Sequence, residues 1–148
     1  MSPDAFVLDA SVLIAAVLPN EPFHADAKAL MGHLIDEGAY IYLPSIAFAE
    51  VAAAISRGPG DEQLALAVVA EYGMRPDLHW IAVDLAPGDL ATEIAAKQRI
   101  RGCDAVYVAL AYAEQATLIT LDGQQRERAP SAVPARTPAQ ALAEWFQI

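Results

Sequence analysis

The chain has 148 residues, a length typical of one domain, and 55% of them are hydrophobic, which excludes a chain that is disordered throughout. Its 9 basic and 19 acidic residues give a net charge of −10 at pH 7, which argues against nucleic-acid binding through a broad basic face and favours a cationic partner. A single cysteine excludes an internal disulfide and a cysteine-rich zinc site. We therefore expect one domain over residues 1–148, in a reducing cytoplasm and without a membrane span.

Short apolar runs alternate with longer helical patterns along the chain. In chain order, the predicted elements are a strand at 6–8, helices at 11–18 and 25–37, a strand at 40–43, helices at 46–57 and 62–72, a strand at 80–83, helices at 87–99 and 104–113, strands at 118–121 and 132–133, and a helix at 138–146. Ser45 and Asp61 are residue types that cap helix N-termini, whereas Gly73 and Gly102 are expected to end or interrupt helices.

The predicted strands are nearly continuous apolar runs, without a regular alternation of polar residues. Such strands are buried on both faces, and their alternation with helices is typical of a parallel sheet. We therefore predict an α/β fold, a three-layer α/β/α sandwich around a small, mostly parallel sheet of about four or five strands.

Four acidic residues occupy positions at which a carboxylate is unexpected. Asp9 directly follows the strand at 6–8, and Asp122 directly follows the strand at 118–121. The carboxyl ends of parallel strands meet at one edge of a sheet, which is where ligands bind in open α/β folds. Glu50 and Asp104 lie on helices that are otherwise apolar. The pattern predicts that these acids converge at one edge of the sheet.

Each acid also has an ordinary structural interpretation. Asp9 and Asp104 are suited to cap the helices that follow them, and the pair Asp122–Gly123 is common in turns. Glu50 has no cation one helical turn away, so it would then have to lie at the solvent edge of its helix. These alternatives stay open for each acid taken alone.

Taken together, the four carboxylates favour a cation site. Two like charges about 4 Å apart repel by roughly 4 kcal/mol at an effective dielectric of about 20, and bound cations would remove that repulsion. Ligand sets made only of oxygen favour hard ions such as Mg²⁺ or Mn²⁺. Such ions catalyse the hydrolysis of phosphodiester bonds and would connect an acidic pocket to an anionic substrate.

In several of its segments the chain resembles the PIN-domain family, and within it the VapC-type toxin ribonucleases. The resemblance rests on residues 7–14, on Glu50, and on residues 103–111 and 118–122, in the order and at the elements expected for the family. It implies a PIN-like fold over nearly the whole chain. It also implies that Asp9, Glu50, Asp104 and Asp122 are the catalytic and metal-binding residues.

The resemblance implies a metal-dependent endoribonuclease that acts on RNA, as the toxin of a type II toxin–antitoxin pair. Asp9, Asp104 and Asp122 would hold one Mg²⁺ or Mn²⁺, and Glu50 would help to hold a second ion or orient a water through it. A small antitoxin would offer an arginine to the carboxylates. Two alternatives remain: a housekeeping RNA-processing nuclease with the same site, and a PIN-like scaffold that binds without cleaving.

Further residues have predicted supporting roles. The hydroxyls of Ser11 and Thr120 are expected to orient the acids or a metal-bound water, the alternatives being an N-cap and simple β-propensity. Four cations near the active edge are expected to steer RNA, unless they are only solvated helix ends: Lys97, Arg99, Arg101 and Arg126. The apolar pair at 145–146 indicates a homodimer or a tail packed on its own core.

Overall fold

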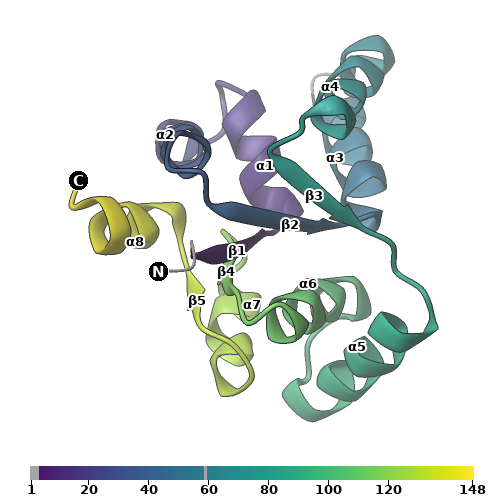
Figure 1. The fold of residues 1–148 in the computed structure, drawn as a ribbon. Helices are drawn as coiled ribbons and strands as arrows, with labels where there is room; N and C mark the ends of the chain where they lie inside the picture. Colours follow the sequence, from purple (N-terminus) through teal and green to yellow (C-terminus); the bar gives the residue numbers. More distant parts are fainter. Residues whose placement is uncertain (1–3, 59) are drawn as a thin grey trace.

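A five-stranded parallel sheet forms the centre of the molecule, in a computed structural model that describes residues 4–58 and 60–148 (Figure 1). The strand order is β3-β2-β1-β4-β5, and each neighbouring pair is parallel. The strands are β1 (Ala5–Leu8), β2 (Tyr40–Pro44), β3 (Leu78–Ile81), β4 (Thr117–Ile119) and β5 (Ala135–Arg136).

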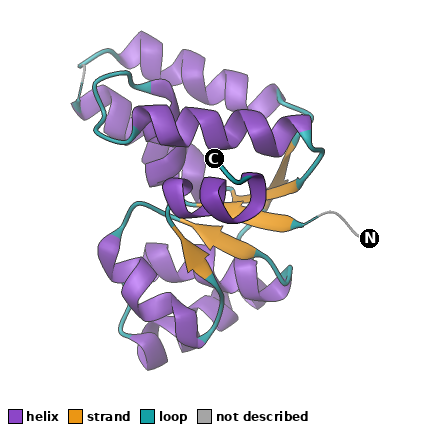
Figure 2. Ribbon diagram, turned by 90° about the vertical axis from the view of Figure 1, so that its left-hand side faces the viewer, coloured by secondary structure: helices purple, strands orange, loops and turns teal. Residues whose placement is uncertain are grey.

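Helices cover both faces of this sheet, as Figure 2 shows from the side. One face carries α1 (Ala10–Val17), α2 (His24–Asp36), α3 (Ile46–Arg57) and α4 (Glu62–Met74). The other face carries α5 (Leu85–Gln98), α6 (Gly102–Ala113) and α7 (Gly123–Arg128), followed by a 3₁₀ turn at Ala129–Ser131. The chain ends in α8 (Pro138–Ala141), which packs beside α2 and continues as a π-helical turn over Leu142–Phe146. The predicted α/β/α sandwich is confirmed.

Strand β1 lies at the middle of the sheet and is buried on both faces. Phe6, Val7 and Leu8 are at most 1% exposed, which explains why the strand is apolar without alternation. Leu8 lies opposite Ile119 of β4, so β1 and β4 end side by side. The backbone N–H of Asp9 donates to the carbonyl of Ile119 at 2.9 Å and extends this pairing by one residue. The two chain segments that follow these strands therefore begin at the same edge.

Gly73 was predicted to end its helix. It lies inside α4 instead, because the helix continues to Met74. A Cβ at this position would lie 3.2 Å from the Phe48 ring. Phe48, on α3, in turn stacks on Trp80 with ring centroids 3.6 Å apart. The glycine is therefore a packing residue that lets α4 approach an aromatic side chain.

Several predicted boundaries are also wrong. The third strand is shifted to Leu78–Ile81. The fifth strand is Ala135–Arg136 in place of 132–133, because the backbone N–H groups of Leu118 and Thr120 donate to the carbonyls of Pro134 and Arg136. Gly102 is the first residue of α6 and not a break before it. Ser45 occupies the N-cap position of α3 but makes no side-chain capping bond.

The apolar pair near the C-terminus packs against its own chain. Trp145 meets Phe6 edge to face with ring centroids 5.2 Å apart, and Phe146 stacks on His33 at 4.9 Å. This contact bears out the alternative of a tail packed on the core, and the homodimer stays a prediction without this support. Among the described residues, no helix combines the length and apolar character that crossing a membrane requires.

The N-cap of α4 is expected to contribute measurably to stability. Asp61 accepts the backbone N–H of Leu64 at 2.9 Å, as its residue type predicted. Asp61→Ala should lower the free energy of unfolding by about 1 kcal/mol, because a helix N–H loses its acceptor. Asp61→Asn keeps a side-chain oxygen and should stay within about 0.5 kcal/mol of the wild type. Urea denaturation of the three proteins checks this, and equal losses in both variants would contradict it.

Candidate active site

An open cleft of about 440 Å³ lies at the carboxyl ends of β1 and β4. It is bordered by α1, α3, the start of α6 and the loop before α7. Its polar and charged lining residues are Asp9, Ser11, Glu50, Arg57, Arg101, Asp104 and Asp122. The four predicted acids, which lie up to 113 positions apart in sequence (122 − 9), are thus brought to one cleft.

Asp9 is the least exposed of the four acids of the cleft. It forms no ion pair in the described part of the chain. Its side chain caps α1, with Oδ2 accepting the backbone N–H of Ser11 at 3.0 Å. The residue is only 5% exposed, and this burial raises the pKa of its carboxyl; the charges of Asp104 and Asp122 add to the effect. Asp9 therefore caps a helix and also presents a destabilised charge to the cleft.

One arginine connects the other two aspartates. Asp104, 6% exposed, lies in the first turn of α6 and does not cap it; Arg101 occupies the N-cap position. Arg101 Nε donates to Asp104 Oδ2 at 2.8 Å, and Arg101 Nη2 donates to Asp122 Oδ2 at 2.9 Å. Asp122 also caps α7, with Oδ1 accepting the N–H of Gln125 at 3.0 Å. A single guanidinium thus bridges carboxylates from two elements.

Glu50 is half-buried on α3 and has a hydrogen-bond partner that sequence analysis missed. Tyr107, fully buried on α6, donates its hydroxyl to Glu50 Oε1 at 2.8 Å. Burial raises the pKa of Glu50, the bond from Tyr107 opposes that rise, and the charges of Asp9 and Asp104 add to it. Glu50 thus keeps partial exposure at an open cleft and also contacts α6, a contact that the solvent-edge interpretation did not include. Tyr107 follows Asp104 by three positions, and this same-face spacing was the available signal.

The two predicted hydroxyls both accept backbone N–H groups, and a hydrogen bond from the Ser11 side chain also opposes the rise in the pKa of Asp9. Ser11 Oγ accepts the N–H of Leu121 at 3.1 Å, and Thr120 Oγ1 accepts the N–H of Asp122 at 3.0 Å. Both bonds orient the segment that carries Asp122. Another buried side chain, missed in the sequence, joins α7 to α6: Gln125 donates Nε2 to the carbonyl of Asp104 at 3.1 Å.

Of the four predicted steering cations, Arg101 lines the cleft, and the other three are not among its described lining residues. Lys97 pairs with Glu93 on the surface of α5, while Arg99 is exposed and Arg126 lies on α7. Arg57 at the end of α3 lines the cleft and was not predicted. It follows Glu50 by seven positions, two helical turns along one face of α3.

The kind of ligand at this cleft fits a hard divalent cation. The acidic groups offer only carboxylate oxygens, which Mg²⁺ and Mn²⁺ prefer, and burial raises the pKa values of Asp9 and Glu50, an effect to which the neighbouring carboxylates add. Across residues 4–58 and 60–148, no three Asp, Glu, His or Cys side chains are placed to hold one ion as they stand. Asp104 and Asp122 contact Arg101 instead.

A family model for the PIN domain matches residues 6–129, which include all four acids of the cleft. The chain belongs to the PIN-domain family. This PIN domain is continued by β5 and α8, which lie beyond the matched residues. No curated protein sequence matches the chain.

Solved structures similar to this PIN domain come from several bacteria. VapBC2 from Rickettsia felis, bound to a DNA fragment from its promoter, aligns with a TM-score of 0.69 at 17% identity, over 90% of this chain and 98% of that one. FitAcB from Neisseria gonorrhoeae aligns with a TM-score of 0.70 at 20% identity, over 90% of this chain and 98% of that one. VapC20 from Mycobacterium tuberculosis is described as a sarcin–ricin-loop-cleaving toxin. It aligns with a TM-score of 0.68 at 16% identity, over 82% of this chain and 93% of that one. These similarities show the shared fold.

Proposed function

We propose that this PIN domain is a metal-dependent endoribonuclease that hydrolyses phosphodiester bonds in RNA. The observation that carries the proposal is the cleft in which Asp9, Glu50, Asp104 and Asp122 meet from four separate segments. Among the described residues, Asp9 and Glu50 form no ion pair, and it is costly to keep them beside two further acids that share one arginine; a scaffold that only binds would have no use for such a cluster. The match to the PIN-domain family supports the same reading.

The chemistry follows from the residues at the cleft. Asp9, Asp104 and Asp122 would hold one or two ions of Mg²⁺ or Mn²⁺. A bound ion would supply an activated water and stabilise the leaving oxygen. Glu50 accepts the proton of the attacking water at the carboxylate oxygen that Tyr107 leaves free. Water oxygen bonds to phosphorus, the phosphorus–oxygen ester bond breaks, and the departing oxygen takes a proton from solvent. Ser11 and Thr120 keep the segment before Asp122 in place.

We further propose that the protein is the toxin of a type II toxin–antitoxin pair, with a small basic antitoxin segment as its partner in the cytoplasm. Structures of the same fold include VapBC from Salmonella typhimurium and a toxin–antitoxin complex from Klebsiella pneumoniae. The net charge of −10 favours a basic partner segment on independent grounds. A short open reading frame directly upstream of the gene supports the toxin, and its absence favours a housekeeping nuclease.

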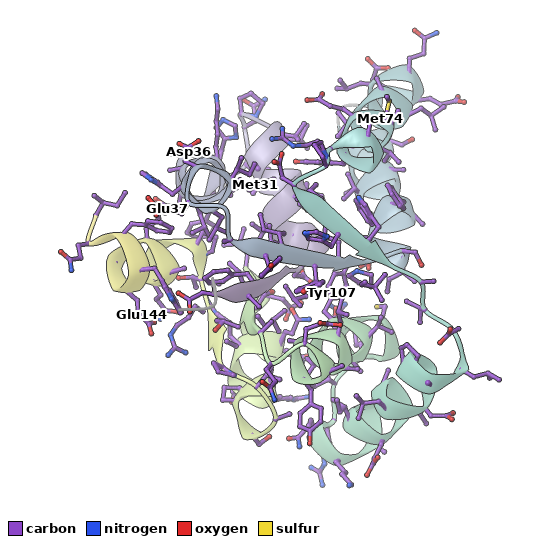
Figure 3. All side chains as sticks on the ribbon, viewed as in Figure 1. Met31, Asp36, Glu37, Met74, Tyr107 and Glu144 are labelled. Atoms are coloured by element: carbon purple, nitrogen blue, oxygen red, sulfur yellow. The ribbon has the colours of Figure 1, made fainter. Side chains whose placement is uncertain are left out.

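Cleavage of RNA by the purified protein tests the enzyme. Total tRNA and ribosomal RNA fragments should be cut in Mn²⁺ or Mg²⁺ and left intact in EDTA. Asp104→Asn should lower the rate by at least about 100-fold, since losing even an outer partner of a metal ligand typically costs roughly 10–100-fold. Asp36→Asn is the matched control: Asp36 is exposed at the C-terminal end of α2, where Figure 3 labels it, and is not among the residues that line the cleft. Cleavage that survives EDTA or Asp104→Asn would contradict the proposal.

A further inference from the structure

Arg101 makes contacts at the cleft that a steering residue would not need. Its guanidinium reaches one carboxylate oxygen of Asp104 and one of Asp122, at 2.8 and 2.9 Å. These two acids lie on different elements, α6 and the β4–α7 loop, so the arginine joins them across the mouth of the cleft. Arginine stays charged at every accessible pH. In this arrangement the single positive charge of Arg101 offsets one of the two negative charges and reduces the repulsion between the acids.

The arginine is attached in a way that allows it to leave. The Arg101 side chain is 65% exposed, whereas that of its partner Asp104 is 8% exposed. The acids are thus held by the fold while the cation lies at its surface. Exposed ion pairs contribute little to stability, so a side chain of this kind is readily displaced into solvent. Two acids that are mostly buried and a cation that is mostly exposed favour exchange of the cation.

We propose that Arg101 is an internal counter-ion that occupies the carboxylate pair in the metal-free protein and is displaced by a divalent cation. The proposal rests on the proposed function, because it takes Asp104 and Asp122 as metal ligands. The Oδ2 atoms that accept from Arg101 are the oxygens that a metal ion would need, so the two cations compete for the same positions. Arg101 would then raise the ion concentration that is needed to load the metal.

The chain contains a matched comparison for this competition. Arg57 lines the same cleft but forms no ion pair with an acid of the described residues. Arg57→Gln removes one positive charge near the carboxylates without freeing an oxygen. Arg101→Gln removes the same charge and frees two oxygens. Arg101→Lys keeps the charge, but a single ammonium cannot reproduce the planar two-armed contact.

Calorimetric titration with Mn²⁺ of the wild-type protein and the three variants tests the competition. We expect Arg101→Gln to bind Mn²⁺ about 3- to 10-fold more tightly than the wild type, Arg101→Lys to lie between them, and Arg57→Gln to change affinity by less than about twofold. In EDTA, Arg101→Gln should melt at a lower temperature than the wild type, because the acids repel once the guanidinium is gone. In saturating Mn²⁺ this difference should disappear.

The outcomes separate the inference from the function. Equal Mn²⁺ affinity in the wild type and Arg101→Gln would overturn the counter-ion and leave the metal-dependent nuclease standing. Equal gains in Arg101→Gln and Arg57→Gln, with Arg101→Lys unchanged, would reduce the effect to net charge and also overturn it. Absence of Mn²⁺ binding in all four proteins would overturn both the inference and the metal dependence of the proposed function.

Discussion

Asp9→Asn is expected to abolish RNA cleavage while leaving the metal-free protein at least as stable as the wild type. The loss of activity should be at least about 100-fold, because the variant removes a buried carboxylate from the cleft. Stability should not fall, because burial raises the pKa of Asp9, which means that the fold disfavours its charge. Asparagine keeps an oxygen that accepts the Ser11 N–H and so preserves the cap of α1.

The pH dependence of this difference has a definite sign. A carboxyl whose pKa is raised by folding destabilises the folded state when it is ionised, so its penalty is present above the raised pKa. The penalty shrinks as pH falls through the raised pKa and disappears below the ordinary value of 3.8, where Asp9 is protonated in both states. The advantage of Asp9→Asn over the wild type should therefore be largest near neutral pH and shrink in acid.

Thermal melts in EDTA across this pH range, with RNA cleavage measured in parallel, check the prediction. Asp9→Ala should melt below Asp9→Asn, because it also loses the cap, at a cost of about 1 kcal/mol or roughly 2–4 °C. Asp36→Asn controls for the loss of one negative charge at an exposed site. A variant Asp9→Asn that is clearly less stable than the wild type at neutral pH would show that the ionised carboxylate stabilises the fold.

Tyr107→Ala is expected to cause the largest loss of stability among the residues at the cleft. Tyr107 is fully buried, and Figure 3 shows it between the sheet and the helices of the α6 face. Removing its ring should lower the free energy of unfolding by about 3–5 kcal/mol, because a cavity replaces a large apolar group. Tyr112, on the same helix and 57% exposed, is the matched control, and Tyr112→Ala should cost less than about 1 kcal/mol.

Tyr107→Phe separates packing from the contact with Glu50. The ring remains, so the free energy of unfolding should fall by only about 0.5–1.5 kcal/mol, the usual value of one hydrogen bond. Glu50 would lose the donor that holds it at 2.8 Å, and we expect cleavage to slow by roughly 10-fold. Denaturation and cleavage rates of the two Tyr107 variants measure both effects. Full activity in Tyr107→Phe would show that Tyr107 packs the core and does not position Glu50.

The sheet could be predicted from periodicity, and the four acids from their positions together with the resemblance to the PIN-domain family. Continuous apolar runs identified the strands, and the rule that parallel strands end at one edge placed Asp9 beside Asp122. Roles that depend on side-chain direction could not be read from spacing. The bridging contact of Arg101 requires the geometry of the α5–α6 connection, where Arg99 adopts a left-handed conformation with φ of 55°. Tyr107 looked like one more apolar position of α6.

The errors have a related cause. Gly73 is a helix breaker by propensity, but the Phe48 ring packs against the glycine and the helix continues past it. The last strand consists of only Ala135–Arg136, and its position depends on which carbonyls the amides of β4 and its extension reach. Such choices are made by tertiary contacts, which a local pattern does not contain.

The order of the strands also determines when during synthesis the cleft can exist. The central strand β1 is made first, yet one of its two neighbours, β4, is more than a hundred residues later, since Phe6 pairs with Thr117. Pairings between such distant segments form slowly. A nascent chain cannot assemble the cleft until Asp122 and the residues after it have left the ribosome. A ribosome that makes this protein is therefore exposed to the completed cleft only after the segment that carries β4 and Asp122 has emerged.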